Sequence, residues 1–453
     1  MEIPNGPRSA VAPSYLLCCL VLGGSAQGIW QNMVLQLLGV AIIAWAAASS
    51  SGDPLPAPAR FLLLLAIAGI AVVVLQAVPL PSYIWEHGVR AHLMEGYRLL
   101  GREVPPLPIS LSPYESLGTL LCFIPPLAIF CAIVRLKAFR PSWLAASLLI
   151  GATGGIVFSA LQVARGGGGG WYPYPETNVG VGVGFFANAN HMADLLVIAI
   201  PFLSALAAAG RTRNFQRYAA LLTLLGSLVL VLIAGIALTH SLAGYLLAVP
   251  AIAASALILL PQASRWRGGI AIIVGLTALA SLGALTMTAI GSNKLGPKAA
   301  GSVESRAVIL QTTAKAISDN MPFGTGLGSF VRVYRLYETP ETVTSEYVVH
   351  AHNEYAELAL ELGLSGIILM LLFLAWWARA AWAVWLNAEG GPFTRAAAVA
   401  AAIVLLHSLV DFPLRTAAIS ACFAMCLALL ADRRRPPRQH PSDLRPSRHL
   451  VFS

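Results

Sequence analysis

Residues 350–363 read HAHNEYAELALELG, and residues 364–386 continue directly as LSGIILMLLFLAWWARAAWAVWL. The second stretch is apolar and long enough for a membrane-spanning helix, which needs about 20 residues. The first carries two histidines and three glutamates within twelve positions, in a chain in which only 11% of residues are charged and 57% are apolar. The apolar stretch therefore indicates the fold, and the polar cluster is where chemistry is expected.

Apolar runs of this kind recur along the 453 residues, whose mean hydropathy is +0.73. In hydrocarbon the backbone must satisfy its own hydrogen bonds, and runs of this length favour helices over the alternating strands of a barrel. The sequence predicts an all-α, polytopic membrane helical bundle of about twelve transmembrane helices. The predicted spans are residues 12–28, 32–49, 61–80, 115–134, 142–163, 190–209, 217–236, 241–260, 269–290, 364–386, 396–411 and 414–431.

The basic residues behind the net charge of +9 gather in loops that alternate along the chain. This pattern is explained by orientation in the membrane, so the charge does not call for a nucleic-acid partner. The positive-inside rule makes these loops cytoplasmic. Both termini are then cytoplasmic, and the loops 81–114, 164–189 and 291–363 face the other side. The basic residues are Arg135, Lys137, Arg140, Arg211, Arg213, Arg217, Arg265, Arg267, Arg379, Arg395, Arg433, Arg434, Arg435 and Arg438.

Four segments follow from this pattern: a bundle of about nine spans at 1–290, a large external loop at 291–363, the final spans at 364–431, and a disordered basic cytoplasmic tail at 432–453. An alternative for the first span is a cleaved signal peptide, since small residues follow it at Gly24–Ala26.

The large external loop is expected to hold two or three helices that cap the bundle. Residues 303–319 and 348–362 have helical composition, and the Gly/Pro-rich stretch 321–328 between them predicts a turn. The loop 164–189, with five consecutive glycines and Trp171-Tyr172-Pro173-Tyr174-Pro175, favours a mobile, non-helical cover.

Most polar groups of chemical interest fall on the external side of this topology. Ionisable groups at the membrane edge cost free energy and usually serve a function. The sequence therefore predicts an external site, as expected for an enzyme that acts on a lipid-linked substrate. The blander alternative is that these groups satisfy one another, for example at i, i+4 spacing on one helix. The residues are Asn188, Asn190, His191, Asp194, Thr239, His240, Arg306, His350, His352, Glu354, His407, Asp411 and Arg415.

The spacing His350-x-His352-x-Glu354 also invites a metal site, because imidazole and carboxylate are good zinc and manganese ligands. Residues two apart share a face only in an extended segment. With the helix predicted to begin near Val349, the two histidines point in roughly opposite directions, so one catalytic base is favoured over two metal ligands.

These residues resemble the O-antigen ligase and O-antigen polymerase superfamily of bacterial inner-membrane glycosyltransferases. The ligase pattern of His, then Asn, Ser or Gln, nine residues and Gly-x-x-Gly fits His352-Asn353 followed by Gly363–Gly366. The segments 185–191, 324–330 and 409–413 also look like family segments, so that the resemblance covers roughly residues 185–415.

The resemblance implies a GT-C-like fold of about twelve spans with a large periplasmic loop, and transfer of a glycan from undecaprenyl diphosphate to an acceptor hydroxyl. The acceptor would be a glycan or lipid A-core, in lipopolysaccharide or exopolysaccharide biosynthesis at the inner membrane. It implies no cofactor, no nucleotide sugar and, for the ligases, no metal. His352 matches the catalytic loop histidine and Arg306 a loop arginine that contacts the diphosphate.

Further substrate-binding residues are expected among Asn353, Asn190, His191 and Asp411. The chain departs from the family at 239–244, which reads Thr-His-Ser-Leu-Ala-Gly where members often have Ser-Arg-Gly. His240 is expected to supply part of the missing charge.

The expected mechanism makes His352 a general base, with an unperturbed pKa near 6.5, oriented by Glu354 or His350. A ligase-type enzyme is favoured by the spacing after His352, and a polymerase of the same superfamily is the close alternative. A flippase or transporter is the alternative from another class, although such proteins usually show related halves and coupling groups near the midplane.

Overall fold

The computed structural model describes residues 6–26, 29–49, 54–85, 90–166, 170–261, 264–290, 297–340, 343, 347–387 and 389–432. The predicted tail beyond Asp432 and the middle of the five-glycine run, at 167–169, lie outside these residues, as do short parts of the two other predicted external loops.

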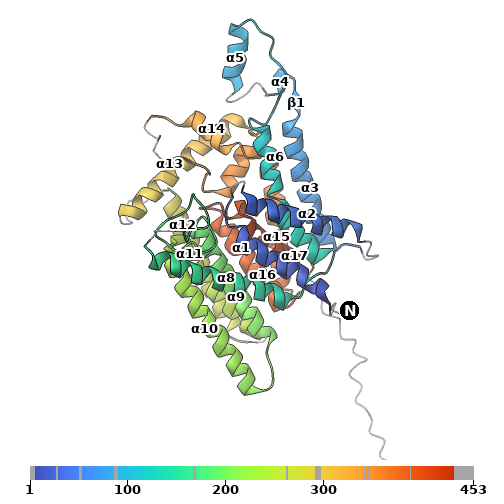
Figure 1. The fold of residues 1–453 in the computed structure, drawn as a ribbon, viewed down its shortest axis with the longest axis vertical. Helices are drawn as coiled ribbons and strands as arrows, with labels where there is room; N and C mark the ends of the chain where they lie inside the picture. The colour runs from blue at the N-terminus through green and yellow to red at the C-terminus, as the bar shows by residue number, and fades with distance from the viewer. Residues whose placement is uncertain are drawn as a thin grey trace, which may run out of the picture.

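Helices make up the described structure apart from one antiparallel pair of two-residue strands, β1 (Pro79–Leu80) and β2 (Leu107–Pro108). The first helices are the 3-10 turn η1 (Pro7–Ala10), α1 (Val11–Leu22), α2 (Trp30–Ala48), α3 (Ala57–Ala77), α4 (Ser82–Trp85), α5 (Ala91–Leu99), α6 (Pro113–Leu121), α7 (Ile124–Val134) and α8 (Pro141–Ala164). They are followed by α9 (Ala189–Ala209), α10 (Phe215–Thr239), α11 (Leu242–Leu259), α12 (Arg267–Ile290), α13 (Pro297–Asn320), α14 (Phe330–Tyr337), α15 (Glu354–Trp385), α16 (Pro392–His407), η3 (Pro413–Arg415) and α17 (Ala417–Ala431) (Figure 1).

Nine helical segments of the described chain are long and apolar enough to cross a membrane, so the protein is a multi-pass membrane protein. Three shorter apolar helices, Pro7–Leu22, Pro392–His407 and Ala417–Ala431, coincide with three further predicted spans. Each predicted span thus falls on an apolar helix, and the all-α membrane fold is confirmed. The count of twelve stays a prediction, because these three helices are shorter than a usual span.

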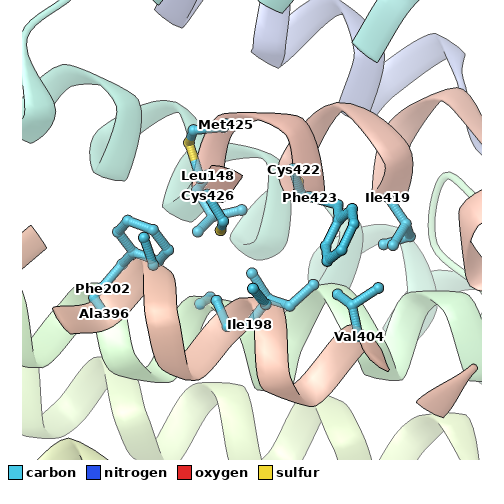
Figure 2. Packing of buried hydrophobic residues seen from close by; sticks show 14 of the residues in the cluster. Leu148, Ile198, Phe202, Ala396, Val404, Ile419, Cys422, Phe423, Met425 and Cys426 are labelled. Atoms are coloured by element: carbon cyan, nitrogen blue, oxygen red, sulfur yellow. The ribbon is translucent and has the colours of Figure 1, made fainter. Parts of the chain in front are cut away.

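The centre of the bundle is α9, which packs against α8, α10, α11 and α16. Its side chains are buried along nearly the whole length, including Ile198 and Phe202. Figure 2 shows Phe202 beside Ala396 of α16, and Ile198 between Phe202 and Val404 of α16, in one apolar core with Phe423 of α17. Close packing of this kind fixes the positions of these helices, and with them the backbone of the polar residues at their ends.

A second, smaller core holds the external helices together. It contains Ile309 and Ala316 of α13, Phe330 and Val333 of α14, and Ala351. Figure 1 shows α13 and α14 lying together beyond the ends of α11 and α12. Since Ala351 is 2% exposed, this core fixes the backbone between the two histidines on either side of it.

Helix α15 is divided by Gly363, whose φ of 61° and ψ of −144° are not helical. A Cβ at this position would collide with the carbonyl oxygen of Pro322 and the amide of Gly324. The amide of Leu364 donates instead to Pro322 O at 2.8 Å. The predicted turn at 321–328 therefore packs into a break that separates a polar half, 354–362, from the apolar half that follows.

Four helices begin close together, and each is capped at its N-terminus by a polar side chain. The amides of Asn190, Gly244, Ala356 and Ile419 donate to the capping side chains of Asn188, Ser241, Asn353 and Thr416, respectively. Such caps satisfy amides that have no partner inside the helix. The N-termini of α9, α11, α15 and α17 also bring the positive ends of four helix dipoles to one region.

Candidate functional site

His352 lies in the non-helical segment before α15, with a left-handed φ of 49°. The predicted helix over 348–362 is wrong at its start, because α15 begins at Glu354 after the Asn353 cap. The His352 side chain is 27% exposed, and its Nδ1 lies 3.4 Å from Asp411 Oδ1. A histidine that faces a carboxylate with one nitrogen keeps the other, Nε2, available for proton transfer.

Asp411 is fully buried in the loop between α16 and α17. Its Oδ2 accepts from Asn190 Nδ2 at 2.6 Å, and its Oδ1 accepts from the Phe412 amide at 2.9 Å. Ser241 Oγ in turn donates to Asn190 Oδ1 at 2.7 Å, which links α9 to the start of α11. This chain of bonds sets the orientation of the carboxylate that faces His352.

The charge of Asp411 is stabilised by the imidazoles and the guanidinium around it. Burial raises the pKa of this carboxyl, but the imidazoles of His352 and His191 and the guanidinium of Arg306 outweigh that effect and hold the pKa well below its usual value. Arg306, on α13, is half-buried. The structure therefore brings Arg306, His352, Asn190 and His191 near Asp411.

The carboxylate beside His352 differs from the expected one. Glu354 accepts from the Leu414 amide at 2.8 Å and lies 3.6 Å from Arg415 Nε. His350 Nδ1 lies 2.9 Å from Glu357 Oε1. The sequence offered Glu354 or His350 to orient His352, whereas the structure places Asp411 there, because the loop after α16 folds back over the start of α15.

Two other predicted binding residues have structural tasks in this arrangement. Asn353 caps α15, and its Nδ2 donates to Leu409 O at 3.0 Å. His240 ends α10 with a left-handed φ of 54°, and its side chain is exposed. The residue after His240, Ser241, makes the contact with Asn190. The role of His240 as a charge near the donor stays a prediction.

Phe412 is a site residue that the sequence analysis did not single out. Its ring centroid lies 5.2 Å from that of His191, 4.1 Å from that of His350 and 5.1 Å from that of His352. The ring thus packs against three imidazoles. His191 is 1% exposed, and neither of its ring nitrogens has a hydrogen-bond partner in the described part of the chain.

Arg415 gathers a second ionic cluster, four residues further along the chain. Its Nη2 lies 3.1 Å from Glu357 Oε1 and 3.2 Å from Glu361 Oε2, and its Nε approaches Glu354. These glutamates are spaced i, i+3 and i+7, so they share one face of the polar half of α15. The spacing was visible in the sequence, but the arginine that pairs with them was not.

The two clusters divide the histidines between different carboxylates, His350 with Glu357 and His352 with Asp411. Among the residues that the structure describes, no group of three or more His, Cys, Asp or Glu side chains is placed to hold a metal ion. The chemistry that this geometry supports is proton transfer at His352, beside an arginine and four helix N-termini that favour an anion.

In a comparison with protein families, residues 227–371 fit the family model described as O-antigen ligase. The matched segment runs from α10 into α15 and includes Arg306, His350 and His352. No curated protein matches the chain. The match makes this segment similar to the O-antigen ligase family. Residues 227–371 of this multi-pass membrane protein are an O-antigen ligase family domain.

Proposed function

We propose that the protein transfers a glycan from an undecaprenyl diphosphate carrier to an acceptor hydroxyl at the periplasmic face, as an O-antigen ligase-type enzyme. The observation that carries the proposal is the pairing of half-exposed His352 with buried Asp411. A general base needs an accessible nitrogen and a fixed orientation. His352 supplies the nitrogen, and Asp411 fixes its orientation.

The reaction follows from the arrangement. The acceptor oxygen attacks the anomeric carbon, its proton passes to His352 Nε2, and the bond from that carbon to the phosphate oxygen breaks. Undecaprenyl diphosphate leaves with the bonding electrons. Displacement in one step inverts the anomeric configuration. Asp411 stabilises the imidazolium that forms, as the carboxylate of a Ser-His-Asp triad does for its histidine.

Binding of the diphosphate is assigned to Arg306, since a guanidinium forms a planar fork that matches phosphate oxygens. The converging helix N-termini add a positive potential at the same place. His191 and Asn190 line the inner side of the site. The periplasmic location rests on the charge pattern of the loops, which puts all these groups on the side opposite the basic residues.

The test is transfer by purified protein in proteoliposomes, with undecaprenyl diphosphate glycan, candidate acceptors and a chelator. His352→Ala is expected to lower the rate by about 100-fold to 10,000-fold, the usual contribution of a general base. His352→Gln keeps a hydrogen-bonding side chain that cannot take the proton, so it should be as inactive as the alanine variant. Near-normal transfer by either variant at equal protein level would overturn the proposal.

The identity of the acceptor separates the two family activities. Attachment of long glycan to a lipid A-core acceptor marks a ligase, whereas extension of one carrier-linked glycan by another marks a polymerase. In a deletion strain, loss of a ligase leaves long chains on the carrier, and loss of a polymerase leaves single repeat units.

A further inference from the structure

Behind the proposed base, four ionisable side chains form a row that runs into the core of the bundle. His352 Nδ1 lies 3.4 Å from Asp411 Oδ1, Asp411 Oδ2 lies 4.0 Å from His407 Nε2, and His407 Nδ1 lies 3.3 Å from Asp194 Oδ1. The members come from the loop before α15, the loop after α16, α16 and α9. Imidazole and carboxylate alternate along the row.

The two inner members are fully buried. The side chains of His407 and Asp194 are both 0% exposed, and the apolar core of α9, α16 and α17 surrounds them. A buried carboxylate costs several kcal/mol unless a positive group compensates it. Nothing in the packing of α9 and α16 demands that charge, because apolar residues of similar volume usually pack as well or better.

The placement of His407 determines its charge. One ring nitrogen faces Asp194 and the other faces Asp411. A neutral imidazole has a single N–H, so it would turn a lone pair toward one of the two carboxylates. The protonated ring turns an N–H toward each carboxylate. With both carboxylates ionised, the inner three members then carry a net charge of −1 next to His352.

The sequence alone suggested a different arrangement of these residues. Asn190 with Asp194, and His407 with Asp411, are each spaced i, i+4 and could have satisfied each other within one helix. The structure pairs Asn190 with Asp411 and Asp194 with His407 between helices, and it also leaves His407 Nε2 4.0 Å from Asp411 Oδ2. The cross-pairing connects α9 to the loop that holds the proposed base.

We infer that Asp194 and His407 are positioning residues that act through Asp411 on His352. They keep Asp411 ionised and oriented, and their net negative charge favours the imidazolium that His352 becomes when it takes the acceptor proton. Neither residue touches substrate. This inference rests on the proposed function, because it assigns a role in the same proton transfer.

The experiment measures the pH dependence of transfer for Asp194→Asn, which keeps the size of the side chain and removes one negative charge. With that charge gone, the His352 imidazolium is less favoured. The acid limb of kcat/KM should move to lower pH by about one unit, and kcat should fall about tenfold with the KM for the donor unchanged. The other charged or titratable groups facing the row are His191, His350, Arg306 and Cys422.

Ser204→Ala is the matched control, since Ser204 is a buried polar residue on the same helix but outside the row. It should leave kcat and the pH profile unchanged. His407→Gln is the second variant of the row and should lower kcat at least as much as Asp194→Asn. This variant still tests the inference if Asp194→Asn does not reach the membrane.

A double-mutant cycle with Asp411→Asn decides whether the effect passes through Asp411. In that background Asp194→Asn should lower kcat by no more than about twofold. A full tenfold loss in both backgrounds, or an acid limb that does not move, would overturn the inference and leave Asp194 with a packing role. Failure of the proposed function is distinguishable, because wild-type protein would then transfer no glycan at all.

Discussion

Asp411 and Arg415 lie four residues apart in the loop before α17, and each organises an ionic cluster of opposite character. Around Arg415 three carboxylates converge within 3.1 to 3.6 Å, and Glu354 and Glu361 also accept backbone amides from Leu414 and Gly328. Around Asp411 the imidazoles lie 3.4 and 4.0 Å away, and His191 has both nitrogens unsatisfied within the described chain.

The difference teaches how one short loop can serve stability and chemistry together. A cluster in which three carboxylates each contact the same guanidinium holds α15 against the loop before α17. A cluster with spare hydrogen-bonding capacity and one half-exposed member can accept a proton and a ligand. Buried polar groups that lack partners are uncommon and call for an explanation of this kind.

Removal of the Arg415 charge should have the largest effect on folding. Arg415→Met leaves three buried carboxylates around an apolar side chain, and loss of one partner from a buried ionic cluster typically costs about 3–5 kcal/mol. The variant should therefore show a strongly lowered Tm in detergent and poor recovery from membranes. Arg332→Met, at an exposed arginine on α14, should change stability by no more than about 0.5 kcal/mol. An unchanged Tm for Arg415→Met would show that the cluster does not hold the helices together.

Substitution of Asp411 should separate activity from stability. Asp411→Asn keeps the shape of the side chain, but its amide can turn an N–H toward His352 Nδ1 and shift the ring to the wrong tautomer, so kcat should fall roughly 100-fold or more. Protein recovery should stay close to that of wild type. The measurement is transfer rate against Tm for both loop variants. Equal loss of Tm in the two variants would erase the distinction between the clusters.

The sequence was sufficient for the membrane helices because their signal is local. An apolar run of 20 residues has to be a helix in a membrane wherever its neighbours lie. The same holds for the turn at 321–328, whose glycines suit the left-handed φ values found at Gly324, Gly326 and Gly328. The start of α15 was also readable, since Asn353 followed by Glu354 and Glu357 is a usual helix N-terminus.

Pairing between side chains could not be read from the sequence, because it depends on how far one helix is shifted and rotated against another. Asp194 and His407 are more than two hundred positions apart, and only the packing of α9 on α16 brings them within 3.3 Å. His352 and Asp411 also come from different segments, and only the folding of the loop after α16 over the start of α15 brings them together. The sequence predicted a set of candidate site residues, whereas the partner of each histidine required the structure.

The smallest expected effect is a pH dependence of stability that belongs to Asp411 alone. Its pKa in the folded protein is depressed, because the imidazoles of His352 and His191 and the charge of Arg306 outweigh the effect of burial. A depressed carboxyl pKa stabilises the fold above the unfolded-state value of about 3.9, and that contribution is lost as the pH falls toward the folded-state pKa. The Tm difference between wild type and Asp411→Asn should therefore be constant near neutrality and shrink below about pH 4. A difference that grows on acidification would mean that the folded protein destabilises the Asp411 carboxylate. The groups around Asp411 would then not stabilise its charge beside His352.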